Sequence, residues 1–233
     1  VESEAFHLKK GEKDFWFSLS MHPVVNSEGR FTHWVAIAHD VSEQTKAQFK
    51  LEYKSRLLAA IAEVNSNFLQ LDDPILALDR CFQLVGEAVF ADRAYYFQNY
   101  ENSDGDAFCS QRLEWNSGKF LPQIDNKLLQ EIPMTMIQEF GKPLTLNQRF
   151  STIVSNLPES EFKSLLVETS VKSILVLPIF VKDSFHGFIG FDDCQSERTW
   201  NDDEISFLKT IAANMAIAIE RAQAVTKVKL AYE

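Results

Sequence analysis

The segment SILVLPIFVKDSFHGFIGFDD, residues 173–193, decides the fold class. Residues 174–181 form an apolar run that is too short to cross a bilayer, and residues 185–193 read as the partner strand. The polar residues 182–184 between them are typical of a tight turn, so the segment predicts a buried β-hairpin. Gly187 and Gly190 lie inside the second strand, where we expect them to leave room for close packing against a helix.

The sequence after this hairpin predicts a long helix with a complete start signal. Asn201 is expected to be the N-cap, with Glu204 three residues later completing a capping box. Trp200 and Ile205 are spaced as a hydrophobic staple across that start. Apolar residues then continue at alternating spacings of three and four almost to the end of the chain.

A second apolar seam lies upstream, in residues 42–70, which contain neither glycine nor proline. Its heptad spacing predicts a connector helix that enters the next domain. Because the two seams lie at the two ends of one domain, we expect the helices to pack together and against a second copy of the chain. The expected homodimer interface comprises Leu57, Ile61, Val64, Phe68, Met215, Ile219 and Ala222.

The remaining regular elements predict a mixed α/β (α+β) domain. Residues 94–101 and 107–115 read as a second hairpin, and Asp73 followed by Pro74 starts a helix. Residues 6–41 read as a separate β-meander of three strands, which is too small to build a core of its own.

Residues 115–170 have an irregular pattern with many apolar side chains, and prolines prevent a single long helix there. Short pieces that arch over a sheet leave a concavity, which favours a pocket for a small, mostly apolar or neutral ligand. A filled core that simply closes one face of the sheet is the alternative, and the pattern does not separate the two. The expected pocket walls are Phe97, Trp115, Ile124, Met136, Phe140 and Phe150.

Composition and missing motifs exclude several function classes. With 23 Lys and Arg against 33 Asp and Glu, the net charge of −10 repels phosphate backbones, so no nucleic-acid partner is expected. No apolar run is long enough for a membrane span, and no membrane contact is expected from this segment. The dispersed cysteines Cys81, Cys109 and Cys194 fit a reducing cytoplasm. Phosphate-binding glycine loops, metal-ligand sets and activated nucleophiles are absent, so no catalytic residue and no metal site is expected.

Three motifs make residues 71–225 resemble a GAF domain. The strand at 173–179 resembles the family's central strand, GFIGFD at 187–192 its neighbour, and WNDDEI at 200–205 the opening of its final helix. The resemblance implies a six-stranded antiparallel sheet with helices on both sides and a sensory role in a bacterial multi-domain protein. No attachment cysteine for a bilin, no haem motif and no cyclic-nucleotide constellation can be placed, so the cofactor is unknown.

Residues 1–41 resemble the C-terminal strands of a PAS domain, on the segments FWFSLS at 15–20 and WVAI at 34–37. Asp40, Val41 and Ser42 match the signature that ends PAS domains and begins a signalling helix, here residues 42–70. Residues 226–233 are then expected to start a linker to an output domain of the histidine kinase or diguanylate cyclase type.

Three functional hypotheses follow. The first is a non-catalytic sensory fragment that relays ligand or partner binding through dimeric helices. The second is a ligand-free GAF dimerisation and relay module, which predicts a filled interior. The third, a thiol-dependent methionine sulfoxide reductase, requires a catalytic and a resolving thiol, and the dispersed cysteines offer no evident pair.

Overall fold

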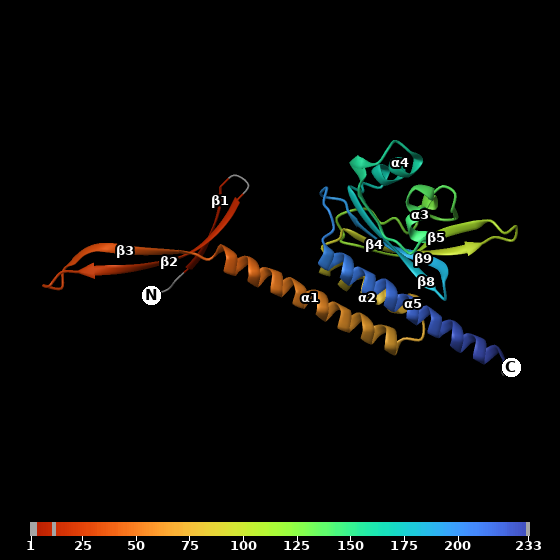
Figure 1. Cartoon of the computed structure of the whole chain (residues 1–233), viewed down its shortest axis with the longest axis horizontal. Helices are drawn as coiled ribbons and strands as arrows, with labels where there is room; N and C mark the ends of the chain where they lie inside the picture. Colours follow the sequence, from red (N-terminus) through yellow and green to blue (C-terminus); the bar gives the residue numbers. More distant parts are fainter. Residues whose placement is uncertain (1–3, 11–12, 232–233) are drawn as a thin grey trace. The chain divides into compact units, whose positions relative to one another are not determined.

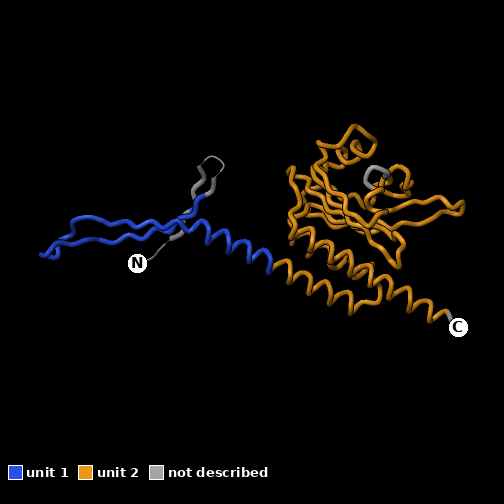
Figure 2. Tube along the Cα trace, viewed as in Figure 1, with its two compact units in different colours: residues 1–55 blue, residues 56–233 orange. Residues whose placement is uncertain are grey.

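The computed structural model describes residues 4–10 and 13–231, and gives the backbone alone for residues 4–6, 8–10, 13–14, 138–140 and 231. The chain divides into two compact units, residues 1–55 and 56–233 (Figure 2).

The first unit contains a three-stranded antiparallel sheet in the order β1-β2-β3, as the sequence predicts. Its strands are β1 (Glu4–Lys10), β2 (Lys13–Val25) and β3 (Phe31–Asp40). The turn before β3 is closed by Asn26, whose side-chain oxygen accepts from the backbone N–H groups of Glu28 and Arg30. Every residue of β3 is exposed, so this sheet has no core of its own.

Helix α1 (Ser42–Gln70) begins directly after β3. The Asp40 carboxylate accepts from the backbone N–H of Ser42 at 2.9 Å, and Trp16 donates its backbone N–H to the Ser42 hydroxyl at 2.8 Å. These bonds satisfy the start of the helix and tie it to β2. The expected connector helix is therefore present.

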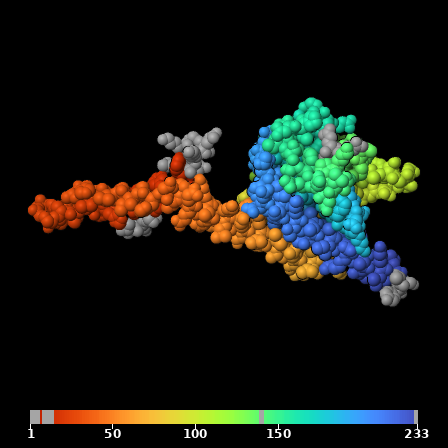
Figure 3. Space-filling view, in the orientation of Figure 1, coloured from red at the N-terminus to blue at the C-terminus, as the bar shows by residue number. Residues whose placement is uncertain are grey.

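The second unit is built on a six-stranded antiparallel sheet in the order β6-β5-β4-β9-β8-β7, which confirms the predicted fold class. The hairpin at residues 173–193 forms its strands β8 and β9, and the turn between β4 and β5 projects from the body of the unit (Figures 1 and 3). The strands are β4 (Arg93–Glu101), β5 (Ala107–Asn116), β6 (Ile132–Pro133), β7 (Phe150–Ile153), β8 (Ser173–Val181) and β9 (Ser184–Asp193).

Long helices cover one face of this sheet (Figure 1). Helix α2 (Pro74–Ala88) packs on β4 and β5, and α5 (Asp202–Ala231) packs on β8. Both start as predicted, because Asp73 accepts from the backbone N–H of Ile75 and the expected capping box closes the start of α5. The fully buried side chains of this layer include Val64, Leu78, Phe82, Val85, Leu208, Ile211 and Met215.

The C-terminal half of α1 packs on α5 within this unit. Arg221 of α5 donates to the backbone carbonyls of Phe68 at 2.6 Å and Leu71 at 3.0 Å, which satisfies carbonyls at the end of α1. The Asn214 side chain donates to that of Asn65.

Shorter pieces cover the opposite face. They are η1 (Lys127–Leu129), α3 (Gln138–Thr145), η2 (Val154–Asn156) and α4 (Glu161–Glu168). Prolines interrupt the segment, as the sequence predicts, and α3 itself contains Pro143.

The two strand glycines serve the neighbouring strand rather than a helix. A Cβ atom at Gly190 would collide with the ring of Tyr95, and one at Gly187 would collide with the backbone oxygen of Phe97. The expectation of helix packing is therefore wrong, because both glycines lie against β4. The glycine that permits close helix packing is Gly86 of α2, which lies against the Trp115 ring.

Candidate functional site

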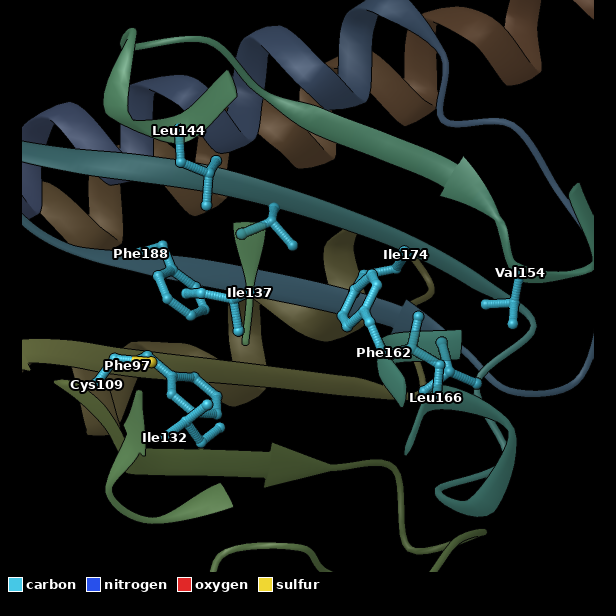
Figure 4. Packing of buried hydrophobic residues seen from close by; sticks show 12 residues of the cluster. Phe97, Cys109, Ile132, Ile137, Leu144, Val154, Phe162, Leu166, Ile174 and Phe188 are labelled. Carbon is cyan, nitrogen blue, oxygen red and sulfur yellow. The ribbon is translucent and has the colours of Figure 1, made fainter. Parts of the chain in front are cut away.

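A cavity of about 70 Å³ lies between the sheet and the shorter pieces. At its apolar end, side chains of β4, β8 and β9 form the sheet side and side chains of α4 form the opposite side. Phe97 and Phe188 stack with ring centroids 4.9 Å apart, and Figure 4 shows Phe162 and Leu166 of α4 near Ile174 of β8. A filled interior, which the second hypothesis requires, is therefore not what this face shows.

The other end of the cavity is polar and built on one register pair. Arg93 of β4 lies opposite Asp192 of β9, and their side chains form a buried ion pair at 3.3 Å. Arg93 also donates to the backbone carbonyl of Thr169 at 2.7 Å. The Tyr95 hydroxyl donates to the Asp192 carboxylate at 3.1 Å, which Gly190 permits by leaving room for the ring.

Burial shifts the acids and the phenol of this cluster. It raises the pKa of Asp192 to about 6, although Arg93 and the Tyr95 hydrogen bond act in the opposite direction. Burial also raises the pKa of Glu114 and places the pKa of Tyr95 well above its ordinary value. The polar end therefore holds ionisable groups in a poorly solvated place, as binding sites commonly do.

A β-bulge determines which side chains of β5 reach the cavity. The register between β4 and β5 shifts after Tyr96, so that Tyr96 pairs with Leu113 and Phe97 with Gln111. As a result Glu114, Gln111 and Cys109 all line the cavity, although strict alternation would place Gln111 on the other face.

Of the six predicted pocket walls, Phe97 lines this cavity. The placement of Trp115 is wrong, because the residue next to Glu114 on β5 points to the opposite face and packs on Gly86 of α2. Phe150 packs against the same apolar cluster, edge-on to Phe162, without lining the cavity.

The other predicted walls lie elsewhere. Ile124 is half-buried outside the cavity, and its carbonyl accepts from the Gln130 side chain. Met136 is exposed and borders an outer groove. The side chain of Phe140 lies outside the described part of the chain, which gives only its backbone.

The predicted dimer seam is used within the chain. Leu57, Val64, Phe68, Met215 and Ile219 are buried in the helix layer, which leaves them no surface for a second copy. Ile61 and Ala222 are half-buried. The heptad spacing is thus explained by packing of the chain's own helices, and the assignment of the five buried residues as an interface needs correction, whereas Ile61 and Ala222 keep part of their surface exposed.

Sequence reasoning missed the polar residues Arg93, Tyr95, Gln111 and Glu114. Alternation along residues 93–97 could have placed Arg93 and Tyr95 beside Phe97 on one face. The neighbouring acids Asp192 and Asp193 differ in role. Asp193 caps a turn, accepting from the backbone N–H groups of Gln195 and Ser196, whereas Asp192 points into the cavity.

The cysteines are unsuited to nucleophilic chemistry. Burial raises the pKa of the Cys81 thiol to about 11 and that of Cys109 and Cys194 to about 12, which suppresses the reactive thiolate at neutral pH. Among the described residues, no three His, Cys, Asp or Glu side chains gather as metal ligands. In the same part of the chain, no helix has the length and apolarity that a bilayer crossing demands.

Solved structures with the same fold include two photoreceptor GAF domains. One is the phycocyanobilin-bound GAF domain of a cyanobacterial phytochrome, with a TM-score of 0.59 and 18% identity over 72% of this chain and 96% of that one. The other is the blue-light-absorbing form of the PixJ GAF domain of Thermosynechococcus elongatus, with a TM-score of 0.56 and 14% identity over 75% and 95%.

A bilin does not fit this chain. The cavity of about 70 Å³ is far below the ~300–1,000 Å³ typical of sites for drug-sized ligands. The cysteine beside it, Cys109, is fully buried, and burial raises its pKa to about 12, so it lacks the character of an attachment thiol.

One similar protein is named Methanogenesis regulatory histidine kinase FilI and comes from Methanothrix harundinacea (strain 6Ac). It is 38% identical over 218 residues, and the match covers 93% of this chain and 24% of that protein. This chain thus spans about a quarter of the relative's length. The GAF domain family model matches residues 73–219, which contain the whole six-stranded sheet, α2, the shorter pieces on the other face and the first part of α5. The chain therefore belongs to the GAF domain family.

Proposed function

We propose that this chain is a non-catalytic sensory module of a signalling protein, in which a small ligand in the cavity alters the packing of α1 and α5. The family supports a sensory role, and the relative's name favours an output of the histidine kinase type. The buried, protonated cysteines argue against the reductase hypothesis, because sulfoxide reduction begins with a nucleophilic thiolate.

The proposal rests on the position of strand β8 between the cavity and the helix layer. In β8, Ile174 and Val176 line the cavity, while Leu175 and Leu177 alternate with them and point to the opposite face. That face lies under α5. A ligand that displaces β8 therefore acts directly on the floor of the helix layer, because closely packed interiors transmit strain.

The first unit is consistent with a second sensory module. Its sheet exposes large apolar side chains on β2 and β3, including Phe15, Met21 and Trp34, which alternation and strand pairing place on one face. Large apolar side chains exposed on one face of a sheet indicate an interaction site. We propose that residues 1–41 are part of a PAS domain whose remaining elements cover this sheet.

A cavity-filling variant tests the relay. Val176→Phe places a larger side chain in the cavity, and we expect faster backbone hydrogen exchange in α5 at residues 205–219. Val167→Phe, on the exposed side of α4, is the matched control and should leave α5 unchanged. A folded Val176→Phe chain with unaltered exchange in α5 would contradict the relay.

Ligand and oligomer are tested together by native mass spectrometry of the purified chain. The sensory proposal predicts a co-purified small molecule or binding from a library, together with a dimer mass. A monomer at tens of micromolar would refute the dimeric relay, and a ligand-free dimer would favour the relay-only module.

A further inference from the structure

The polar end of the cavity leaves buried acceptors without donors. Oε1 of Gln111 and Oε1 of Glu114 meet no donor among the described residues, and Nε of Arg93 meets no acceptor there. Gln111 is 3% exposed and Arg93 is 2% exposed, and both line the cavity. Unsatisfied buried polar atoms are unusual in native proteins, and a missing partner at a cavity is their ordinary explanation. The two acceptors are complementary to a group with two N–H donors, and the Arg93 N–H is complementary to an acceptor such as an amide carbonyl.

The charges at this end argue against an anionic group. Arg93 forms its ion pair with Asp192 at 3.3 Å and also attracts the Glu114 carboxylate, so one cation faces two carboxylates at this end. The other oxygen of Glu114, Oε2, accepts from the backbone N–H of Gln123 at 2.6 Å. A carboxylate or phosphate placed here would face Glu114 and Asp192 across a poorly solvated space, where like charges repel strongly.

An outer groove of about 560 Å³ leads toward the same place, between α4 and the segment that carries η1 and β6. It shares Ile132, Ile137, Phe162 and Leu165 with the cavity, so these side chains separate the two spaces. The groove is bordered by Glu131, Glu161 and Glu168 against a single Lys127. A negative approach disfavours anions and attracts cations, independently of the inner polar end.

The size of the cavity limits the ligand. A volume of about 70 Å³ corresponds to roughly five to seven water molecules. The lining at the other end is aromatic and aliphatic, so the ligand needs an apolar body of only a few carbon atoms.

Building on the proposed sensory role, we propose that the cavity binds a small amine or primary amide, with a short apolar body toward Phe97 and Phe188 and its N–H donors on Gln111 and Glu114. Access is from the outer groove, past the side chains shared by the two spaces.

Three probes with the same isopropyl body test this: isobutylamine, isobutyramide and isobutyrate. We expect the methyl resonances of Ile132, Ile174 and Val176 to shift saturably with the amine or the amide. The dissociation constant of isobutyrate should be at least tenfold weaker. Isobutyrate that binds equally or better, or the failure of all three probes to bind, would overturn the proposal.

A charge-removing variant localises the effect. Glu114→Gln keeps the shape of the side chain and should raise the dissociation constant of isobutylamine at least tenfold, whereas the exposed Glu197→Gln should not change it. An unchanged constant in folded Glu114→Gln would contradict the assigned contact. The relay is tested separately, by hydrogen exchange in α5 of Val176→Phe. The sensory role therefore stands even when the probes show that the proposed ligand class is wrong.

Discussion

The two faces of the six-stranded sheet differ in how completely they are packed. On the helix face, Leu78, Leu208 and Met215 are fully buried among long helices. On the other face, shorter pieces cover the sheet and leave a cavity of about 70 Å³ with unpartnered polar atoms. One face is thus packed throughout and the other keeps a cavity, and β8 belongs to both.

This difference follows from the covering elements. A long amphipathic helix presents a continuous apolar stripe to a sheet and can fill the space above it. The segment between β5 and β8 is divided by prolines and turns, so its pieces meet the sheet at separate points. A gap between such pieces requires no special sequence motif.

The largest expected effect on stability comes from Leu→Ala, which removes the same side-chain atoms from either face of the sheet. Leu208→Ala should lower the free energy of unfolding by ~2–5 kcal/mol, because a fully packed site cannot collapse around the void. Leu165→Ala, at the half-buried cavity wall, should cost about half as much. Urea unfolding of both variants measures this, and equal losses would contradict the contrast between the faces.

A smaller loss is expected at Gly190. In Gly190→Ala, the added methyl group collides with the Tyr95 ring, which must move away from Asp192, at a cost of ~1–3 kcal/mol. Gly141→Ala is the matched control, because its Cβ would meet Ile137 at an ordinary 3.6 Å within α3. We expect Gly141→Ala to be neutral or slightly stabilising in the same unfolding experiment. Equal behaviour of the two variants would show that the close approach of Tyr95 is dispensable.

The face with the cavity should also make stability depend on pH. The pKa of Asp192 is raised from 3.8 to about 6, so between these values the folded chain binds a proton that the unfolded chain releases. The free energy of unfolding should therefore fall as the pH rises from about 4 to about 6, and Glu114 acts in the same direction. An NMR titration of the Asp192 carboxyl carbon should give a midpoint near 6. A midpoint near 4 would show that Asp192 does not contribute to the pH dependence of the free energy of unfolding.

The sequence predicted the fold better than the site, for a physical reason. The hairpin at residues 173–193 and the capping box at Asn201 and Glu204 are local patterns, readable without knowing their neighbours. The polar end of the cavity depends on the pairing of Arg93 with Asp192, ~100 residues apart, and on the bulge that turns Gln111 inward.

Trp115 and the dimer seam show the same limit. An aromatic residue at a strand end can face either side of a sheet, and only the register places Trp115 on the helix face. A heptad seam fits a partner from the same chain as well as one from a second copy. For Leu57 and Val64 the partner is the chain itself, which the burial of both residues establishes.

The smallest expected change in stability concerns the outer side of the helix layer, where a second copy could still bind. Leu58, Leu69 and Ile217 are exposed there, and Leu69 and Ile217 border one groove between α1 and α5. Leu69→Lys should change the free energy of unfolding by no more than ~0.5 kcal/mol, because its side chain already meets water. If these residues join two copies, the same change should shift the light-scattering mass from dimer to monomer. Val64→Lys is the contrasting variant: it buries an unpaired charge and should unfold the domain rather than separate copies. A Leu69→Lys chain that remains dimeric would place the contact between copies on another surface.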